Sequence, residues 1–457
     1  MTVSTITRVA ISIAFGISAF TALASPELTL DQAIKLAHKN DPWLQGSRLK
    51  QSAMESNGIA AGTLPDPRVS LGLMNMPVDS WEFNQEGMTQ FKVGVSQMFA
   101  RGDSLTLKRS QLKIEASKYP VLREERRAQV ETLISQLWLD AFVARKNIEL
   151  IEENWALFEQ MVEVAKANYS TNVGKTRQQD VIRAQLEIVR LEDRLTVEQQ
   201  RLETVLARMN EWLHAYNGEN FEQDFYAEPS GIRLSTQLPK IRLQAPLTLE
   251  DWNVSRNELA KMIAKHPALL AIDIKHSVAK KGIELAKQGY KPKWGVNASY
   301  GYRDDMPGRG ERADLFSVGV SVDIPLFTRN KQDKRVAASI AESESVKTEK
   351  LLLTKQMISS IEKEMRHLKR LSDRQAIYEN QLLKQTHEQA EASLTAYTND
   401  DGDFAEVVRA RIAELDAKIA ALQIDIDALK ALARLNYFFA QSGASQAKPQ
   451  KNQVGEY

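Results

Sequence analysis

Four short motifs occur twice in this chain, in the same order and at a nearly constant spacing. Such ordered self-similarity indicates a duplicated structural unit. The sequence therefore predicts a first repeat over 25–216, a linker over 217–246 and a second repeat over 247–440. The matched pairs are Leu28–Asp31 with Leu247–Glu250, Pro42 with Pro267, Pro67 with Pro292, and Val93–Ser96 with Val318–Ser321.

The two ends of the chain differ from the repeats. Arg8 precedes an apolar run over 9–23 that closes on the small residues Ala22 and Ala24. This pattern is typical of an export signal peptide, here 1–24; a retained anchor is the alternative, although the run is shorter than the roughly 20 residues of a spanning helix. The chain has no cysteine, so a lipidated N-terminal cysteine is excluded. The polar end, 441–457, is predicted to be disordered.

Each repeat contains one segment with the period of two residues that is typical of β-strands. Val69, Leu71 and Leu73 alternate with small or polar residues, and a second alternating run ends at Phe99. Alternation over about ten residues is typical of the strands of a membrane β-barrel. We expect hairpins at about 66–99 and 292–327. A soluble sheet packed on helices is the alternative for both.

The remainder of each repeat has the spacing of long helices. Apolar residues step by three and four from Leu137 to Tyr169 and again from Val181 to Met209, with Glu198 as the exception. Sustained spacing of this kind indicates a coiled-coil seam. A helix from Leu105 to Tyr169 would be about 95 Å long at 1.5 Å per residue. The expected class is therefore mainly α with a small β part, built from helices lying side by side.

Charge and motif content exclude several functions. The net charge is +1, and no block of basic residues is present, so nucleic-acid binding is not expected. The six histidines show no HExxH spacing, and there is no Gly-x-Ser-x-Gly elbow. We expect no enzyme activity, no cofactor and no metal site. Four methionines near the first hairpin could ligate Cu(I), but packing is the favoured interpretation: Met74, Met76, Met88 and Met98.

Four strands cannot close a barrel, and an open sheet edge in lipid leaves unpaired backbone groups that cost several kcal/mol each. Closure therefore requires more than one copy. Two copies supply eight strands, a barrel filled by side chains, whereas three supply twelve and can leave an opening. If strands and helices share an axis, the product is a channel.

The motifs also resemble a known family. The stretches Leu28–Ile34, Asn40–Leu44 and Leu64–Pro67, together with the duplicated plan, resemble the TolC family of outer-membrane efflux proteins. The segment Leu73–Trp81 is similar to the heavy-metal branch, the CusC- and CzcC-like proteins. The resemblance implies a homotrimer with a 12-stranded β-barrel in outer-membrane lipid, continuous with an α-helical barrel in the periplasm. It also implies a periplasmic adaptor protein and an inner-membrane RND-type pump as partners.

In that family the two helix-to-helix turns form the periplasmic tip. The resemblance implies adaptor contacts at Val173, Gly174, Lys175, Thr176 and Gly402, and a constriction formed by Asp180, Arg183, Asp400, Asp401, Asp403, Glu406 and Arg409. Three copies of these carboxylates would form an acidic ring that attracts cations. Pairing of Asp180 and Glu406 with the two arginines, as a latch, and simple solvated turns are the alternatives.

The expected function is a passive exit duct for heavy-metal cations such as copper, silver, cobalt, zinc or cadmium. A drug or type I secretion duct of the same family is one alternative. An exported coiled-coil scaffold or adhesin is the alternative from another class.

Overall fold

The computed structural model describes 27–170, 178–215, 233–244, 254–308, 310–399 and 402–442. The predicted signal peptide and most of the predicted tail lie outside these residues, as does most of the predicted linker. The described part is mainly helical, as expected, and contains one small sheet.

The elements of the first half of the chain are α1 (Leu30–Asn40), α2 (Pro42–Ala61), β1 (Arg68–Met74), β2 (Gln90–Phe99), α3 (Ser104–Ala116), α4 (Lys118–Ser170) and α5 (Gln178–Leu213). The second half has α6 (Arg256–Ile263), α7 (Pro267–Lys287), β3 (Lys293–Tyr302), β4 (Leu315–Asp323), α8 (Gln332–Ile377), α9 (Leu383–Thr398) and α10 (Phe404–Phe438). A short 3₁₀ helix, η2 (Gln288–Tyr290), follows α7, and a π-helical turn, η3 (Tyr378–Leu382), joins α8 to α9.

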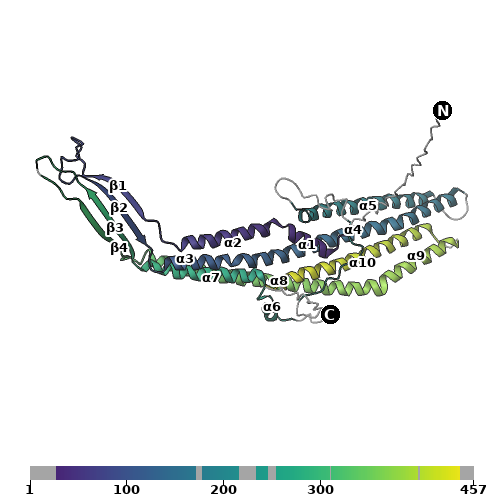
Figure 1. Cartoon of the computed structure of the whole chain (residues 1–457). Helices are drawn as coiled ribbons and strands as arrows, with labels where there is room; N and C mark the ends of the chain where they lie inside the picture. Colours follow the sequence, from purple (N-terminus) through teal and green to yellow (C-terminus); the bar gives the residue numbers. More distant parts are fainter. Residues whose placement is uncertain are drawn as a thin grey trace, which may run out of the picture.

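The molecule is an elongated rod with the sheet projecting from one end (Figure 1). Next to the sheet, helices lie side by side in the order α2, α3, α7, α8. In the other half of the rod the order is α5, α4, α10, α9, so that α5 and α9 form the two margins. None of the helices in the described part of the chain is both long and apolar enough to cross a membrane.

Among the described residues, three apolar clusters hold the helices together along the rod. The first joins α1 and α4 to the end of α5, and Trp138 and Ile134 of α4 are fully buried in it. The second joins α6 and α7 to α8 and α10. The third, near the far end, surrounds Phe158 of α4 and Leu415 of α10. The predicted seams are therefore confirmed, and α4 takes part in two of the three clusters.

The four strands form one antiparallel sheet in the order β1-β2-β3-β4. Leu71 pairs with Val93, Val93 with Tyr300, and Tyr300 with Phe316, so these four side chains form one row on one face. Leu71 and Phe316 are 69% and 71% exposed. The helices therefore do not cover this face, in contrast to the alternative of a sheet packed on helices.

The opposite face of the sheet carries small and polar residues. Ser70 pairs with Gly94, Gly94 with Ser299, and Ser299 with Ser317, which forms the equivalent row on that side. Because paired residues of an antiparallel sheet share a face, the register separates apolar from polar residues over most of the sheet, with Met98 and Leu315 among the apolar exceptions on the polar face. The predicted alternation is therefore confirmed in all four strands.

The expected continuous helix from Leu105 to Tyr169 is interrupted. α3 ends at Ala116 and α4 begins at Lys118, with Ser117 between them. Pro120 lies in the first turn of α4 and has no N–H to donate to the carbonyl of the preceding turn. The prediction extended the helix back to Leu105, although the apolar steps begin at Leu137, and it overlooked the proline; the long helix is two helices.

Corresponding positions of the two halves cap their helices with different residues. Asp41 accepts a hydrogen bond from the backbone N–H of Trp43 at 2.9 Å, at the start of α2. At the matching position of the second half, His266 Nδ1 accepts from the N–H of Ala268 at 3.1 Å, at the start of α7. The Nε2 atom of His266 lies 3.0 Å from the carbonyl oxygen of Tyr437. His266 must therefore be neutral to cap α7, since a protonated ring has no acceptor.

We expect acid to weaken the start of α7 through this cap. Burial lowers the pKa of His266 below its ordinary 6.5, only partly opposed by the bond to Tyr437. The unfolded chain therefore takes up the proton first, so this contribution to stability is complete above pH 6.5 and is lost as the pH falls through the folded pKa. The protection factors of the amides at the start of α7, which correct the exchange rates for their intrinsic pH dependence, should fall as the pH is lowered from about 7.5 to about 5. His266→Asn, a cap that does not titrate, should flatten this dependence.

The matched control for this measurement is His367→Asn, because the side chain of His367 is 46% exposed. It should leave the pH dependence at α7 unchanged. An unaltered pH profile in His266→Asn would contradict the assignment.

Candidate functional site

The end of α4 and the start of α5, together with the end of α9 and the start of α10, lie at the end of the rod opposite the sheet (Figure 1). One joins α4 to α5 and the other joins α9 to α10. Arg194, about halfway along α5, and Asp416 of α10 form an ion pair at 2.8 Å, which connects the two helical hairpins. Several of the predicted site residues lie outside the described residues: Val173, Gly174, Lys175, Thr176, Asp400 and Asp401.

The described part of the second turn is built around Gly402 and Asp403. A Cβ atom on Gly402 would lie 2.6 Å from the backbone nitrogen of Tyr397, so only glycine permits this close approach. Asp403 caps α10, since its Oδ1 accepts from the N–H of Ala405 at 3.1 Å. These residues have a clear local role in forming the turn.

The predicted charged residues occupy the first turns of α5 and α10. Glu406 and Arg409 form an ion pair on the surface of α10, with Nη2 and Oε1 2.6 Å apart. Asp180 is buried in the first turn of α5, and Arg183 is exposed. A carboxylate in the first turn of a helix also interacts favourably with the helix dipole. The structure thus places an exposed acidic and basic pair on α10 and a buried acid on α5.

Further along α10 from this end lies a charged cluster that the sequence analysis missed. Arg411 and Glu414 of α10 are buried and form an ion pair at 2.9 Å. Arg411 also pairs with Glu391 of α9 at 2.6 Å, and Glu414 accepts from His387 of α9 at 2.9 Å and pairs with Lys418 at 3.0 Å. The cluster replaces apolar packing between α9 and α10 with directional contacts.

A signal for this cluster was present in the sequence. The alignment of the two halves that matches Asp180 with Glu406 also matches Ile188, a seam residue of α5, with Glu414. A charged residue at a seam position indicates a buried ionic contact, because an unpaired charge there would be costly.

The electrostatics of the cluster favour ionised Glu414. Burial alone would raise the pKa of Glu414, but hydrogen bonds from His387, Lys418 and Arg411 outweigh it and lower the pKa to about 2. The contribution of the ionised group to stability is therefore present above its ordinary pKa of 4.5 and is lost as the pH falls toward about 2. The α9–α10 hairpin is held by this cluster throughout the neutral range.

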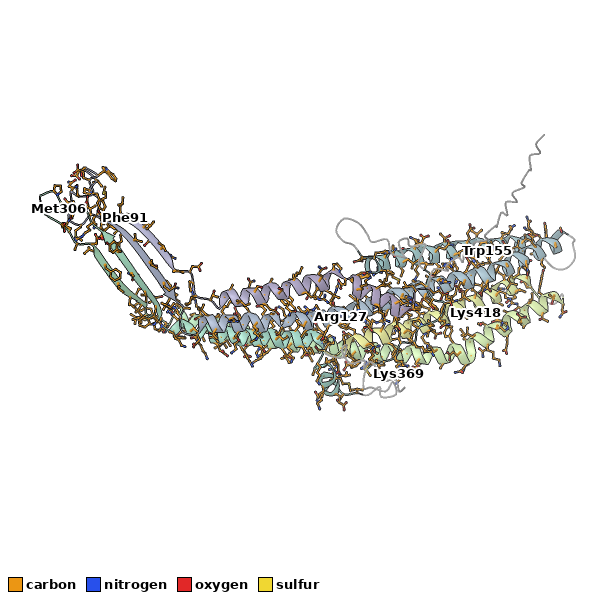
Figure 2. The ribbon with its side chains drawn as sticks, viewed as in Figure 1. Phe91, Arg127, Trp155, Met306, Lys369 and Lys418 are labelled. Carbon is orange, nitrogen blue, oxygen red and sulfur yellow. The ribbon has the colours of Figure 1, made fainter. Side chains whose placement is uncertain are left out.

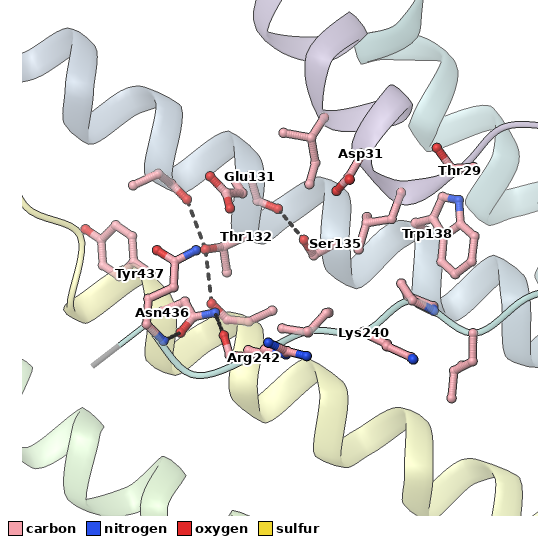
Figure 3. A pocket seen from close by; sticks show the side chains of 18 of the residues that line it. Thr29, Asp31, Glu131, Thr132, Ser135, Trp138, Lys240, Arg242, Asn436 and Tyr437 are labelled. Carbon is pink, nitrogen blue, oxygen red and sulfur yellow. Dashed lines mark hydrogen bonds between the residues drawn. The ribbon is translucent and has the colours of Figure 1, made fainter. Parts of the chain in front are cut away.

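A cavity of about 460 Å³ lies in the middle of the rod, where the segment 233–244 crosses α4 and α10 (Figure 3). Asn436 of α10 holds this segment by two bonds, from its Nδ2 to the carbonyl of Arg242 at 2.9 Å and from the N–H of Gln244 to its Oδ1 at 2.8 Å. Both polar atoms of this side chain in the cavity wall are therefore bonded to the backbone of the segment. We interpret the cavity as part of the junction between segments, not as a catalytic site.

One of the four methionines, Met98, has the packing role that was favoured for them. The sulfur of Met98 lies over Gly295 on the polar face of the sheet, where a Cβ atom would be only 2.6 Å from it. Figure 2 shows another methionine, Met306, in the β3–β4 loop, at the same end of the sheet as Phe91. Trp155 and Lys418 lie far from this end, along the helices. Among the described residues, no group of three or more His, Cys, Asp or Glu side chains could hold a metal ion.

We expect Glu414→Gln to destabilise the α9–α10 hairpin by about 2 kcal/mol, the order of a lost hydrogen bond to a charged group. Hydrogen exchange of both helices at neutral pH should increase. Glu388→Gln is the matched control, since the side chain of Glu388 on α9 is 62% exposed. Equal exchange in the two variants would show that the cluster does not hold the hairpin.

No protein-family model and no curated protein matches the chain. Solved structures do match. A structure of CusC is 12% identical, with a TM-score of 0.70, and covers 90% of this chain and 92% of that one. VceC from Vibrio cholerae, an outer membrane protein, is 13% identical, with a TM-score of 0.70 over 90% and 96%. A membrane protein from Pseudomonas aeruginosa is 12% identical, with a TM-score of 0.73 over 96% and 97%.

Other matching structures include the outer-membrane channels OprN, CmeC from Campylobacter jejuni and MtrE from Neisseria gonorrhoeae, each 12% identical. At these identities the likeness concerns the backbone arrangement. The expectation drawn from the resemblance to TolC-family proteins is confirmed at that level: the chain has the fold of these outer-membrane channel proteins.

Proposed function

We propose that the chain is a TolC-family exit duct of the outer membrane, which passively conducts substrate delivered by an inner-membrane RND-type pump through a periplasmic adaptor protein. One observation carries the proposal. The chain presents an open four-stranded sheet with a continuous exposed apolar face, and this sheet leads directly into a layer of long helices. A soluble protein would bury such a face.

The edges of the sheet support assembly from several copies. Within one chain, β1 and β4 each have only one neighbouring strand in the described sheet. In lipid, the unpaired backbone groups of both edges require partners, which β4 and β1 of adjacent copies would supply. Three copies would form a 12-stranded barrel with an opening. The apolar face would then meet lipid and the face of Ser70, Gly94 and Ser299 would line the passage.

Aromatic residues near the strand ends fit this orientation. Phe83 stacks on Tyr302 with ring centroids 6.2 Å apart, at one end of the sheet. Aromatic girdles at both lipid interfaces are typical of membrane barrels. Five aromatic residues near the strand ends are exposed and are the candidates for such girdles: Trp81, Phe99, Trp294, Tyr302 and Phe327.

The helices would continue the barrel as a tube. Because α5 and α9 lie at opposite margins of the layer, rotation of copies about a common axis would place the α5 margin of one against the α9 margin of the next. The order of elements supports a tandem duplication, since two helices, two strands and a long helical hairpin occur in that order in each half. We retain 25–216 and 247–440 as the proposed repeats.

The proposed duct has two candidate classes of cargo. The sequence resemblance and the likeness to CusC favour a heavy-metal duct. The channels OprN, CmeC and MtrE have a similar fold, so the fold alone does not select the cargo. A drug or type I secretion duct is therefore the second candidate. A sensitivity panel of metals and drugs on a deletion strain distinguishes the two.

We expect the protein to form heat-modifiable trimers in outer-membrane fractions; a coiled-coil scaffold or adhesin would not. Val318→Arg places a charge on the exposed apolar face, where it should cost about 2 to 4 kcal/mol if that face meets the middle of the bilayer. The matched control is Ser317→Arg on the polar face of the same strand. Trimer yield should fall in Val318→Arg alone. Equal yields in the two variants would contradict a lipid-facing sheet.

The proposed constriction gives a second prediction. We expect Glu406→Ala to raise the leak conductance of single channels in planar bilayers, since it removes the partner of Arg409 and one carboxylate per copy from the narrow end. Asp180→Ala should act in the same direction. Glu211→Ala, an exposed carboxylate at the other end of α5, serves as the control. Unchanged conductance and salt response in both test variants would exclude these residues from the gate.

A further inference from the structure

The charged residues of the sheet all lie on one of its faces. Each strand has one: Arg68 on β1, Lys92 on β2, Lys293 on β3 and Asp323 on β4. The strand register places all four on the face of small and polar residues, opposite the apolar face. Three of the four are basic, so this polar face has a net positive charge.

The single carboxylate has basic partners of its own. Asp323 forms an ion pair with Arg101, which follows β2, and Lys293 lies directly opposite Asp323 on the neighbouring strand. Two positive charges therefore surround one negative charge where β4 ends, close to the helices. Asp323 leaves the charge of Lys92, further along the sheet, unbalanced.

The surroundings of Lys92 are set within one chain. It lies near the start of β2, close to the loop over 75–89, and β2 is an inner strand of the sheet. Lys92 is opposite Gly72 on one side and Gly301 on the other, so neither neighbour has a side chain that could neutralise the ammonium group. Arg68 is likewise opposite an uncharged residue, Ser96.

Contact with lipid headgroups is a common role for basic residues near the ends of membrane-spanning segments. That role suits side chains on the surface that faces lipid. In the proposed barrel this surface is the face of Leu71 and Phe316, and Lys92 lies on the opposite one. The basic side chains would therefore project into the passage.

We propose that the β-barrel passage favours anionic solutes over cations, and that Lys92 sets this preference with Arg68 as a second contributor. The inference rests on the proposed function, because it assumes a closed barrel. It adds a class of cargo, small compounds with carboxylate, sulfonate or phosphate groups in place of free metal cations. Rings of lysine or arginine occur in pores that select anions, and copies related by rotation would place every Lys92 in one such ring.

The loops beyond the sheet have the opposite charge. Glu82 in the β1–β2 loop and Asp305 and Glu311 in the β3–β4 loop are exposed carboxylates. The proposed constriction at the helical end also contains carboxylates. The sign of the charge therefore changes along the passage, and a test must measure the electrostatic potential within the sheet.

A cysteine at Ser70 can report this potential, since the chain has no cysteine of its own. Ser70 is exposed on the polar face, next to Arg68 along β1 and diagonal to Lys92 on β2, and such diagonal pairs lie about 7 to 8 Å apart. The full-length variant Ser70→Cys in lipid vesicles is treated with the anionic sulfonatoethyl and the cationic trimethylammonium-ethyl methanethiosulfonate. The ratio of the two rates, divided by that of a free thiol in solution, should favour the anionic reagent.

Adding Lys92→Gln should lower this ratio by about fivefold at an ionic strength of about 0.01 M and about twofold at about 0.15 M, because salt screens the charge. Lys50→Gln is the matched control, since Lys50 is an exposed residue of α2, away from the sheet. A ratio equal to that of the free thiol, or one that Lys92→Gln does not lower, would overturn the preference for anions. Protection of Ser70→Cys from both reagents would also overturn it.

Val318→Cys on the apolar face separates this inference from the proposed function. It should react with neither charged reagent if that face meets lipid. If Val318→Cys is protected and Ser70→Cys reacts without preference for the anionic reagent, only the inference fails. If Val318→Cys reacts as readily as Ser70→Cys, the apolar face meets water, and the proposed function fails together with the inference.

Cargo has its own readout in a deletion strain that carries the full-length variant Arg68→Glu with Lys92→Glu. This strain should be more sensitive to anionic compounds than a strain with the unmodified chain, and equally sensitive to metal cations. Lys50→Glu serves as the control for an added carboxylate. Greater sensitivity to metal cations alone, or no change for either class of compound, would overturn the assignment of anionic cargo.

Discussion

Packing of apolar side chains along α4 supports the rest of the structure. This helix contacts α1, α5, α7 and α10, and its fully buried residues include Ile134, Leu139 and Trp138. Trp138 also donates its indole N–H to the carbonyl of Leu28 at 3.0 Å, which fixes the start of the described chain against the helix. Because helices this long gain most of their stability from packing, α4 holds both helical hairpins together.

The same chain leaves large apolar surfaces without a partner in its described part. The row of Leu71, Tyr300 and Phe316 on the sheet and the stripe of Ile182 and Val189 on α5 are exposed. Surfaces of this size mark contacts with lipid or protein. The proposed duct accounts for both by a single arrangement of copies, with the sheet face toward lipid and the helical margins toward each other.

Much of the fold could be predicted from the sequence because its patterns are local. Alternation in residues such as Val69 and Leu73 was sufficient to locate strands, and three-four spacing located the helices. The break at Ser117 was missed because the helix was extended back beyond the apolar steps, which begin at Leu137, and Pro120 was overlooked. The cluster of Arg411 and Glu414 was missed because a charged pair three residues apart is typical of a helix surface, and the match of Glu414 with the seam residue Ile188 was not considered. The residues of the two helix-to-helix turns were assigned to the constriction and the adaptor contacts by resemblance, and their role stays a prediction.

The sequence by itself determined which face of each strand and helix is apolar, since that follows from the order of side chains and the period of the backbone. Only the tertiary structure decided which of these faces is covered. Ile182 and Val408 occupy equivalent positions, yet one is exposed and the other buried. The reason is physical: α10 lies beside α4 within the chain, whereas α5 lies at the margin of the layer, and a margin arises only when the helices are arranged in space.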